Sequence, residues 1–96
     1  LDVMIMKFNK GIIGYDAVVE MDKFGVRPLP PEELIQYCTA NPSHQKQKPL
    51  ASLKTITWNG YLYSLLLSFG DAGRRMSAVP YTCIFKDMCR FPVVLK

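Results

Sequence analysis

The stretch Leu53–Gly70, LKTITWNGYLYSLLLSFG, decides the predicted fold because it holds the strongest turn signal in the chain. Asn59-Gly60 lies between two apolar runs, and both residue types tolerate the positive φ that a two-residue type I′ turn requires. Side chains alternate between the two faces of a strand. The stretch therefore predicts a β-hairpin. The expected cross-strand pairs are Trp58 with Tyr61, Ile56 with Tyr63, and Lys54 with Leu65.

One face of this hairpin is apolar throughout and is expected to face the core, with Trp58 as an anchor. Its members are Ile56, Trp58, Tyr61, Tyr63, Leu65, Leu67 and Phe69. A helix is the alternative for the second half, since Leu62, Leu65, Leu66 and Phe69 also fall at helical spacing and Gly70 could end it. The unbroken apolar alternation from Tyr61 to Phe69 favours the strand.

Composition predicts a single domain, residues 1–96, because 96 residues bury one core but not a second. No apolar stretch approaches the roughly 18 residues of a membrane span, and the first residues lack the pattern of a signal peptide. Three cysteines, Cys38, Cys83 and Cys89, are too few for a disulfide framework, and the odd number would leave one thiol over. An intracellular location, in cytoplasm or nucleus, is expected.

The first half of the chain predicts a hairpin followed by a helix. Val3–Phe8 is apolar on both faces and is expected to be a strand that is covered on both sides or central in the sheet. Ile12–Met21 alternates and is expected to be its partner strand. The prolines and glutamates of residues 30–33 predict a helix start, because proline fits the first turn and acidic groups favour the positive end of the dipole. Asn41-Pro42 is expected to end that helix.

The second half predicts two further strands separated by loops. Residues 42–49 and 70–78 are polar or glycine-rich and are expected to be loops. Val79–Lys86 alternates, and Cys89–Leu95 could pair with it. Pro92 cannot donate a ladder hydrogen bond, so this last strand is expected at an edge or a bulge. The predicted class is α+β: a mainly antiparallel sheet of about five or six strands built from hairpins, with one short helix packed on one face.

The net charge of +4 conceals two halves of opposite sign. Residues 1–43 hold four basic and six acidic groups, whereas residues 44–96 hold eight basic and two acidic groups. A basic surface attracts phosphate, anionic lipid or an acidic protein. The candidate acidic face is Asp16, Glu20 and Asp22 on the predicted second strand. The candidate basic contacts are Lys46, Lys48, Arg74, Arg75, Lys86 and Arg90.

No catalytic or cofactor motif stands out, so no enzyme activity, cofactor or metal is predicted. The Cys and His residues could form a zinc site only with gaps wider than the usual spacing of paired cysteines. The glycines at 70 and 73 lack the Lys-Ser/Thr of a phosphate-binding P-loop. Arg74-Arg75-Met76-Ser77 resembles the pattern accepted by basophilic protein kinases, which makes Ser77 a candidate phosphorylation site.

These observations favour a non-enzymatic protein-interaction or assembly module that binds a partner protein or copies of itself. The alternative is a basic module that binds single-stranded nucleic acid through phosphate pairing and base stacking; contact with a membrane surface is left open. Opposite charges are expected to orient a head-to-tail contact between copies. The candidate association strand is the C-terminal one, with Phe91, Val93, Val94 and Leu95.

Overall fold

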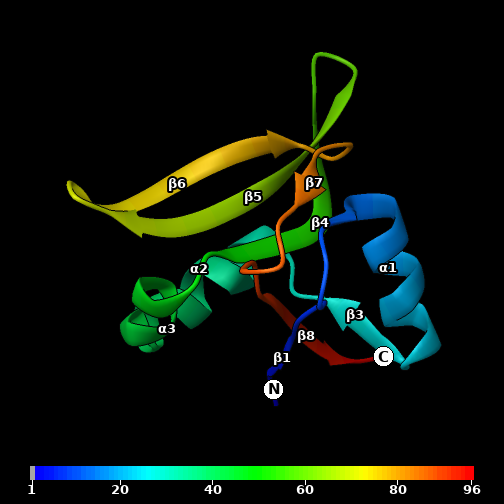
Figure 1. Cartoon of the computed structure of the whole chain (residues 1–96), viewed down its shortest axis with the longest axis horizontal. Coiled ribbons are helices and arrows are strands. Elements are labelled where there is room, and N and C mark those ends of the chain that lie inside the picture. The colour runs from blue at the N-terminus through cyan, green and yellow to red at the C-terminus, as the bar shows by residue number, and fades with distance from the viewer. Residues whose placement is uncertain (1) are drawn as a thin grey trace.

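A computed structural model describes residues 2–96 and shows an α+β fold with three helices and three small antiparallel sheets (Figure 1). The helices are α1 (Gly14–Lys23), α2 (Pro31–Ala40) and α3 (Pro42–Gln47). The strands are β1 (Met4–Met6), β2 (Ile12–Ile13), β3 (Val26–Pro28), β4 (Leu50–Trp58), β5 (Tyr61–Gly70), β6 (Gly73–Pro80), β7 (Ile84–Phe85) and β8 (Phe91–Leu95). The sheets have the orders β1–β8–β3, β2–β7 and β4–β5–β6. The α+β class is confirmed, but a single sheet of five or six strands is wrong for the described residues.

The β4–β5 hairpin forms at the predicted turn. Asn59 and Gly60 have φ of 51° and 80°, and Trp58 pairs with Tyr61. The strand prediction for residues 61–69 is therefore confirmed and the helix alternative is wrong. A bulge between Ser52 and Ile56 shifts the register, so that Leu65 pairs with Ser52 and not with Lys54. The extra residues of this bulge are on β4. They have no opposite neighbour on β5, so β4 bends at this point.

Only the middle of the predicted apolar hairpin face lies in the core. Leu65 and Leu67 are buried, whereas Trp58 and Tyr61 are 66% and 69% exposed. The prediction of Trp58 as a core anchor is therefore wrong. The physical reason is that the hairpin is longer than the core that it covers, so its end projects beyond the rest of the molecule (Figure 1).

Residues 12–21 do not form the predicted strand. Only β2 is extended, it pairs with β7, and α1 follows directly. Gly14, Ala17 and Met21 are buried at helical spacing on one face of α1. Gly14 packs closely against Tyr81. A Cβ at position 14 would lie only 2.7 Å from the Tyr81 ring, so a larger residue does not fit there. The predicted first hairpin is therefore wrong.

The predicted helix at residues 31–40 is confirmed as α2, with Leu34 and Cys38 buried and with Asn41 as its C-cap. The following segment is not a loop, because α3 begins at Pro42. A proline in the first turn costs no intrahelical hydrogen bond. Gln45 fixes this short helix to the sheet: its side chain is buried and donates a hydrogen bond of 2.6 Å to the Ser68 carbonyl.

Residues 70–78 contain a strand in place of the predicted loop. β6 pairs with β5 along its whole length, beginning with Gly70 opposite Gly73. Gly73 has φ of 103°, a conformation that favours glycine. Because β6 extends to Pro80, the strand predicted over residues 79–86 is reduced to β7.

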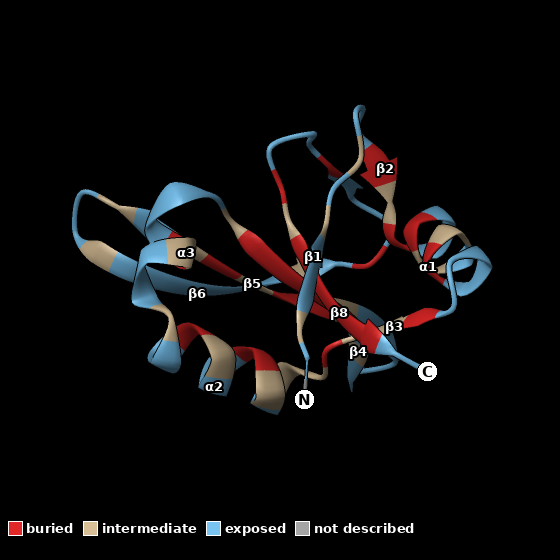
Figure 2. Cartoon of the chain, turned by 90° about the horizontal axis from the view of Figure 1, so that it is seen from below, coloured by how far each residue is buried: buried red, intermediate tan, exposed pale blue. Residues whose placement is uncertain are grey.

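The C-terminal strand β8 is central, which makes the prediction of an edge strand wrong. It pairs with β1 on one side and with β3 on the other. Phe91, Val93 and Val94 are at most 2% exposed, and Figure 2 shows β8 as the buried strand between its neighbours. Leu95 alone of the proposed association residues is exposed. Conversely, β1 is an edge strand, and its Met4 and Ile5 are exposed, contrary to the expectation of a strand that is covered on both sides or central.

A side-chain hydrogen bond compensates for the proline within β8. The Leu29 N–H donates to the Pro92 carbonyl at 3.1 Å, so these residues form a hydrogen-bonded antiparallel pair. Proline has no N–H to return to the Leu29 carbonyl. The Ser52 hydroxyl donates to that carbonyl at 2.6 Å instead. β4 therefore supplies the donor that allows proline in a central strand.

Two apolar clusters form the core, one on each side of β8. The first surrounds Phe91 and Met21 and lies under α1. The second joins Leu34 of α2 to Leu67 of β5 and Val94 of β8. This arrangement leaves the two ends and the outer edge of the β4–β5–β6 sheet beyond the core. No helix within residues 2–96 is long and apolar enough to cross a membrane.

Candidate interaction surfaces

Three of the six candidate basic residues gather near the β5–β6 turn, and we call this group the basic end: Lys46, Arg74 and Arg75. The Lys46 Nζ lies 5.5 Å from the centroid of the Phe69 ring, within the range of a cation–π contact. Arg74 pairs across the strands with Phe69. Arg75 bends over Gly70, with its Nε 2.9 Å from the position that a Cβ would occupy there. The basic end thus combines cations with an exposed aromatic ring.

The other basic candidates lie elsewhere. Lys48 and Arg90 line a separate cavity of about 180 Å³ together with His44. The Arg90 N–H donates a hydrogen bond of 2.9 Å to the carbonyl of Pro49, the residue that follows Lys48. Lys86 is exposed after β7 and lines neither this cavity nor the basic end. The six candidates therefore form no single basic surface.

The acidic candidates lie on α1 and not on a strand face. Asp16 and Glu20 are four residues apart and share a helix face. Glu20 forms an ion pair of 3.1 Å with Lys23, and Asp22 forms one with Lys96. Lysines of the same chain thus offset most of this acidic charge.

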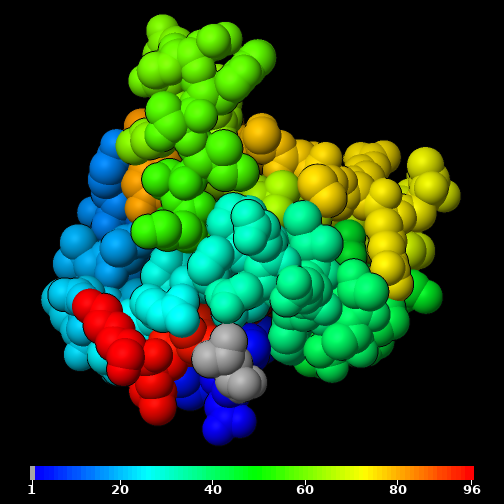
Figure 3. Space-filling model, turned by 180° about the vertical axis from the view of Figure 1, so that it is seen from behind, coloured from blue at the N-terminus to red at the C-terminus, as the bar shows by residue number. Residues whose placement is uncertain are grey.

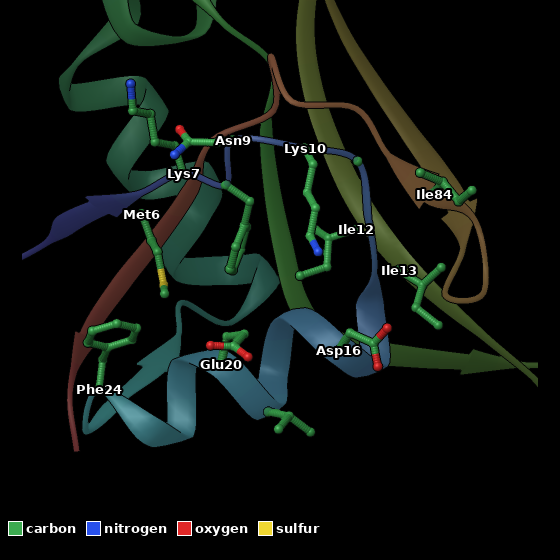
Figure 4. Close-up of a pocket in the computed structure, with 13 residues that line it drawn as sticks. Met6, Lys7, Asn9, Lys10, Ile12, Ile13, Asp16, Glu20, Phe24 and Ile84 are labelled. Atoms are coloured by element: carbon green, nitrogen blue, oxygen red, sulfur yellow. The ribbon is translucent and has the colours of Figure 1, made fainter.

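A groove of about 920 Å³ lies between α1 and the segment 7–11 (Figure 4). Lys7 and Lys10 come from the segment, whereas Asp16 and Glu20 come from the helix. The sequence does not reveal this groove, because the apolar spacing of residues 12–21 predicts a strand where α1 forms. The groove offers charges of both signs, but the described residues contain no group of three or more side chains suited to a metal ion.

The end of the β4–β5 hairpin, residues 55–63, is a second exposed surface, which we call the hairpin tip. It contains no charged residue. Trp58 lies 6.4 Å from Tyr63, centroid to centroid, and its neighbours Ile56 and Tyr61 are also exposed. Figure 3 shows the tip as a projection from the body of the molecule. The hairpin tip and the basic end lie at opposite ends of β5.

The outer edge of β6 is the third surface. The Tyr81 N–H donates to the Leu62 carbonyl at 3.0 Å, which fixes the alternation of hydrogen bonds along the β5–β6 ladder. Residues 73, 75, 77 and 79 bond to β5, so the N–H and C=O groups of Arg74, Met76 and Ala78 point away from it. No strand among the described residues pairs with this edge. Ser77 is exposed within β6 and pairs with Leu66, so it lies on a strand and not in a loop.

The three thiols differ in exposure. Cys38 and Cys89 are buried, and Cys83 is exposed. Burial raises the pKa of the Cys38 thiol, and the positive charge of Arg74 opposes part of that rise. Burial also raises the pKa of Cys89. Raised pKa values make thiols poorer nucleophiles at neutral pH.

No protein-family model, curated protein or solved structure matches this chain. The functional conclusion therefore depends on the geometry and chemistry of the surfaces described above.

Proposed function

We propose that this chain is a non-enzymatic protein-interaction module that assembles with copies of itself through the β4–β5–β6 sheet. The observation that carries the proposal is that this sheet extends past the core at both ends with large apolar side chains exposed. Trp58 and Tyr61 are exposed at the hairpin tip, and Phe69 and Met76 are exposed near the basic end.

These residue types favour a protein contact. Aromatic residues and methionine are enriched where two proteins meet, and tryptophan and tyrosine often dominate the binding energy. Removing one such side chain from water contributes about 1.5–3 kcal/mol. Exposed apolar side chains are common singly, but this one sheet exposes six large ones: Ile56, Trp58, Tyr61, Leu62, Phe69 and Met76.

Charge makes a smaller contribution than the sequence suggested. The acidic residues Glu20 and Asp22 already pair with lysines of the same chain. A head-to-tail contact between the acidic helix and the basic end would compete with these pairs. Charges across an interface mainly affect orientation and association rate, so we assign the affinity to the apolar residues of the sheet.

Light scattering across a concentration series tests the proposal. We expect the mass to rise from monomer towards a discrete oligomer, and the rise to persist at high salt. Met76→Lys should weaken association because it places a charge at the apolar contact. Phe24→Lys is the matched control, since Phe24 is exposed to 69% but lies outside the sheet. A monomer mass from micromolar to millimolar protein would contradict the proposal.

A second candidate function, binding of single-stranded nucleic acid, is supported by the basic end. Lys46 lies over Phe69, Arg74 pairs across the strands with Phe69, and Arg75 lies over Gly70 at the same end of β5. Single strands are bound by such combinations of backbone charge pairing and base stacking. Fluorescence anisotropy with single-stranded RNA should then show binding that weakens steeply with salt and is lost in an Arg74→Glu, Arg75→Glu variant. Absence of binding at low salt would contradict this function.

A further inference from the structure

We propose that two copies join edge to edge through β6, in antiparallel register about a two-fold axis at Met76. The inference rests on the proposed function, because it requires self-association, and it names the strand and the register. The resulting assembly would be one continuous sheet in which the β6 strands of the two copies lie side by side.

The length of the free edge favours β6 over the other edges. β6 has eight residues, whereas the edge strands β1 and β3 have three each. β4 is bent by its bulge, and its first residue, Leu50, is already bridged to Arg90. Bulges and very short strands are features that prevent edge-to-edge pairing. β6 is regular along its whole ladder with β5, so it lacks both features.

The hydrogen-bonding positions fit this register. The outward backbone groups belong to Arg74, Met76 and Ala78. With Met76 opposite Met76 of the second copy, Arg74 lies opposite Ala78, and each of these residues exchanges both backbone hydrogen bonds. The exposed Met76 side chains, each 61% accessible in the monomer, then lie against each other.

Charge and proline disfavour the neighbouring registers. Moving the two-fold axis to residue 75 places Arg75 directly opposite Arg75, and like charges at opposite positions destabilise a sheet. Moving it to residue 77 places Arg74 opposite Pro80, which has no N–H to donate. With the axis at Met76, Arg75 faces Ser77 and Pro80 lies outside the paired segment. The arginines therefore select a register and do not prevent pairing.

Disulfide trapping tests the register in a Cys83→Ser background, which removes the exposed native thiol. Opposite residues of a hydrogen-bonded pair have Cα atoms about 5.5 Å apart, within the range of a disulfide. The Met76→Cys variant should therefore form a covalent dimer under mild oxidation. Arg74→Cys is the control, because the two residues 74 would lie roughly 14 Å apart at about 3.4 Å per residue.

Three further variants separate this inference from the proposed function. Met76→Pro removes an outward N–H without removing a hydrogen bond to β5, so it should return the protein to monomer while leaving its circular dichroism unchanged. Ser77→Asp should tighten the dimer severalfold, because it places a carboxylate opposite Arg75 of the second copy, and Ser77→Lys should weaken it.

The outcomes are distinct. If mass rises with concentration but Met76→Cys is trapped no faster than Arg74→Cys, the β6 register is wrong and self-association stands. If mass rises and Met76→Pro leaves it unchanged, the β6 edge is not the contact. If the wild-type chain stays monomeric at every concentration, both the inference and the proposed function are overturned.

Discussion

Replacing Ser52 with alanine should destabilise the fold through a single unsatisfied carbonyl. Ser52 is fully buried, and its hydroxyl donates at 2.6 Å to the Leu29 carbonyl, which faces the proline of β8. Without the hydroxyl, that carbonyl has no donor, because Pro92 has no N–H. A buried polar group left without a partner costs about 1–3 kcal/mol. We therefore expect the free energy of unfolding in urea to fall by about 2 kcal/mol.

A matched control exists in the same sheet. Ser64 is also fully buried, but its hydroxyl has no hydrogen-bond partner among the described residues. Ser64→Ala removes the same atom without breaking a hydrogen bond, so it should leave stability nearly unchanged or raise it. The difference between the two serine variants isolates the hydrogen bond from the loss of one buried oxygen atom.

The double-mutant cycle with Pro92→Ala tests the cause. Alanine at position 92 supplies the N–H that proline lacks, directly opposite the Leu29 carbonyl. Pro92→Ala has its own cost in packing, but the cycle removes that cost from the coupling energy. In the Pro92→Ala background, Ser52→Ala should cost at least about 1 kcal/mol less than in the wild type. An equal cost in both backgrounds would refute the compensation.

Three other measurements test the fold and its titrating groups. Gly60→Val should lower the free energy of unfolding by more than about 1–2 kcal/mol, because Gly60 has φ of 80° and a β-branched residue resists that conformation; an unchanged urea midpoint would contradict the turn. Acrylamide should quench Trp58 fluorescence nearly as freely in the monomer as in the unfolded chain, and strong protection at low concentration would contradict its exposure. Burial raises the pKa of the Cys38 and Cys89 thiols, so the folded state keeps their protons to higher pH than the unfolded chain does. Their contribution to stability should be complete below the ordinary thiol pKa of about 8.5 and should fall as pH rises through the raised pKa. A urea midpoint that increases as the pH is raised past about 8.5 would contradict this.

Local signals predicted the elements that local interactions determine. Asn59-Gly60 predicted the hairpin, and the Pro-Pro-Glu-Glu sequence before Leu34 predicted α2. Both elements are confirmed because a turn conformation and a helix start depend on a few neighbouring residues. The placement of Lys46 beside Arg74 is partly accessible to the same reasoning, since both flank the predicted hairpin.

The failures have separate physical causes. Ala17 and Met21 are apolar at a spacing of four, which fits one face of a helix and also one face of a strand, so periodicity alone did not identify α1. The six-residue helix α3 is too short to be stable alone and depends on the hydrogen bond of Gln45 to β5. β6 carries almost no apolar pattern, and its pairing with β5 determines its conformation. Each of these elements is decided by contacts that lie outside its own sequence.

The position of β8 explains two wrong predictions: β8 is buried where an exposed edge strand is predicted, and the end of the β4–β5 hairpin is exposed where a core face is predicted. β8 pairs with β1, placing Met4 opposite Val93, so the two ends of the chain close the first sheet. No neighbouring turn signals a pairing between such distant residues. Without such a signal, the missing N–H of Pro92 predicts an edge for the C-terminal strand, and the apolar hairpin face is then the surface predicted for the core. Once β8 fills the core, the β4–β5 hairpin extends beyond it, and β6 has no further strand to cover its outer side. The apolar residues of the hairpin tip and the free edge of β6 are thus exposed for the same reason, which is why we assign association to this sheet.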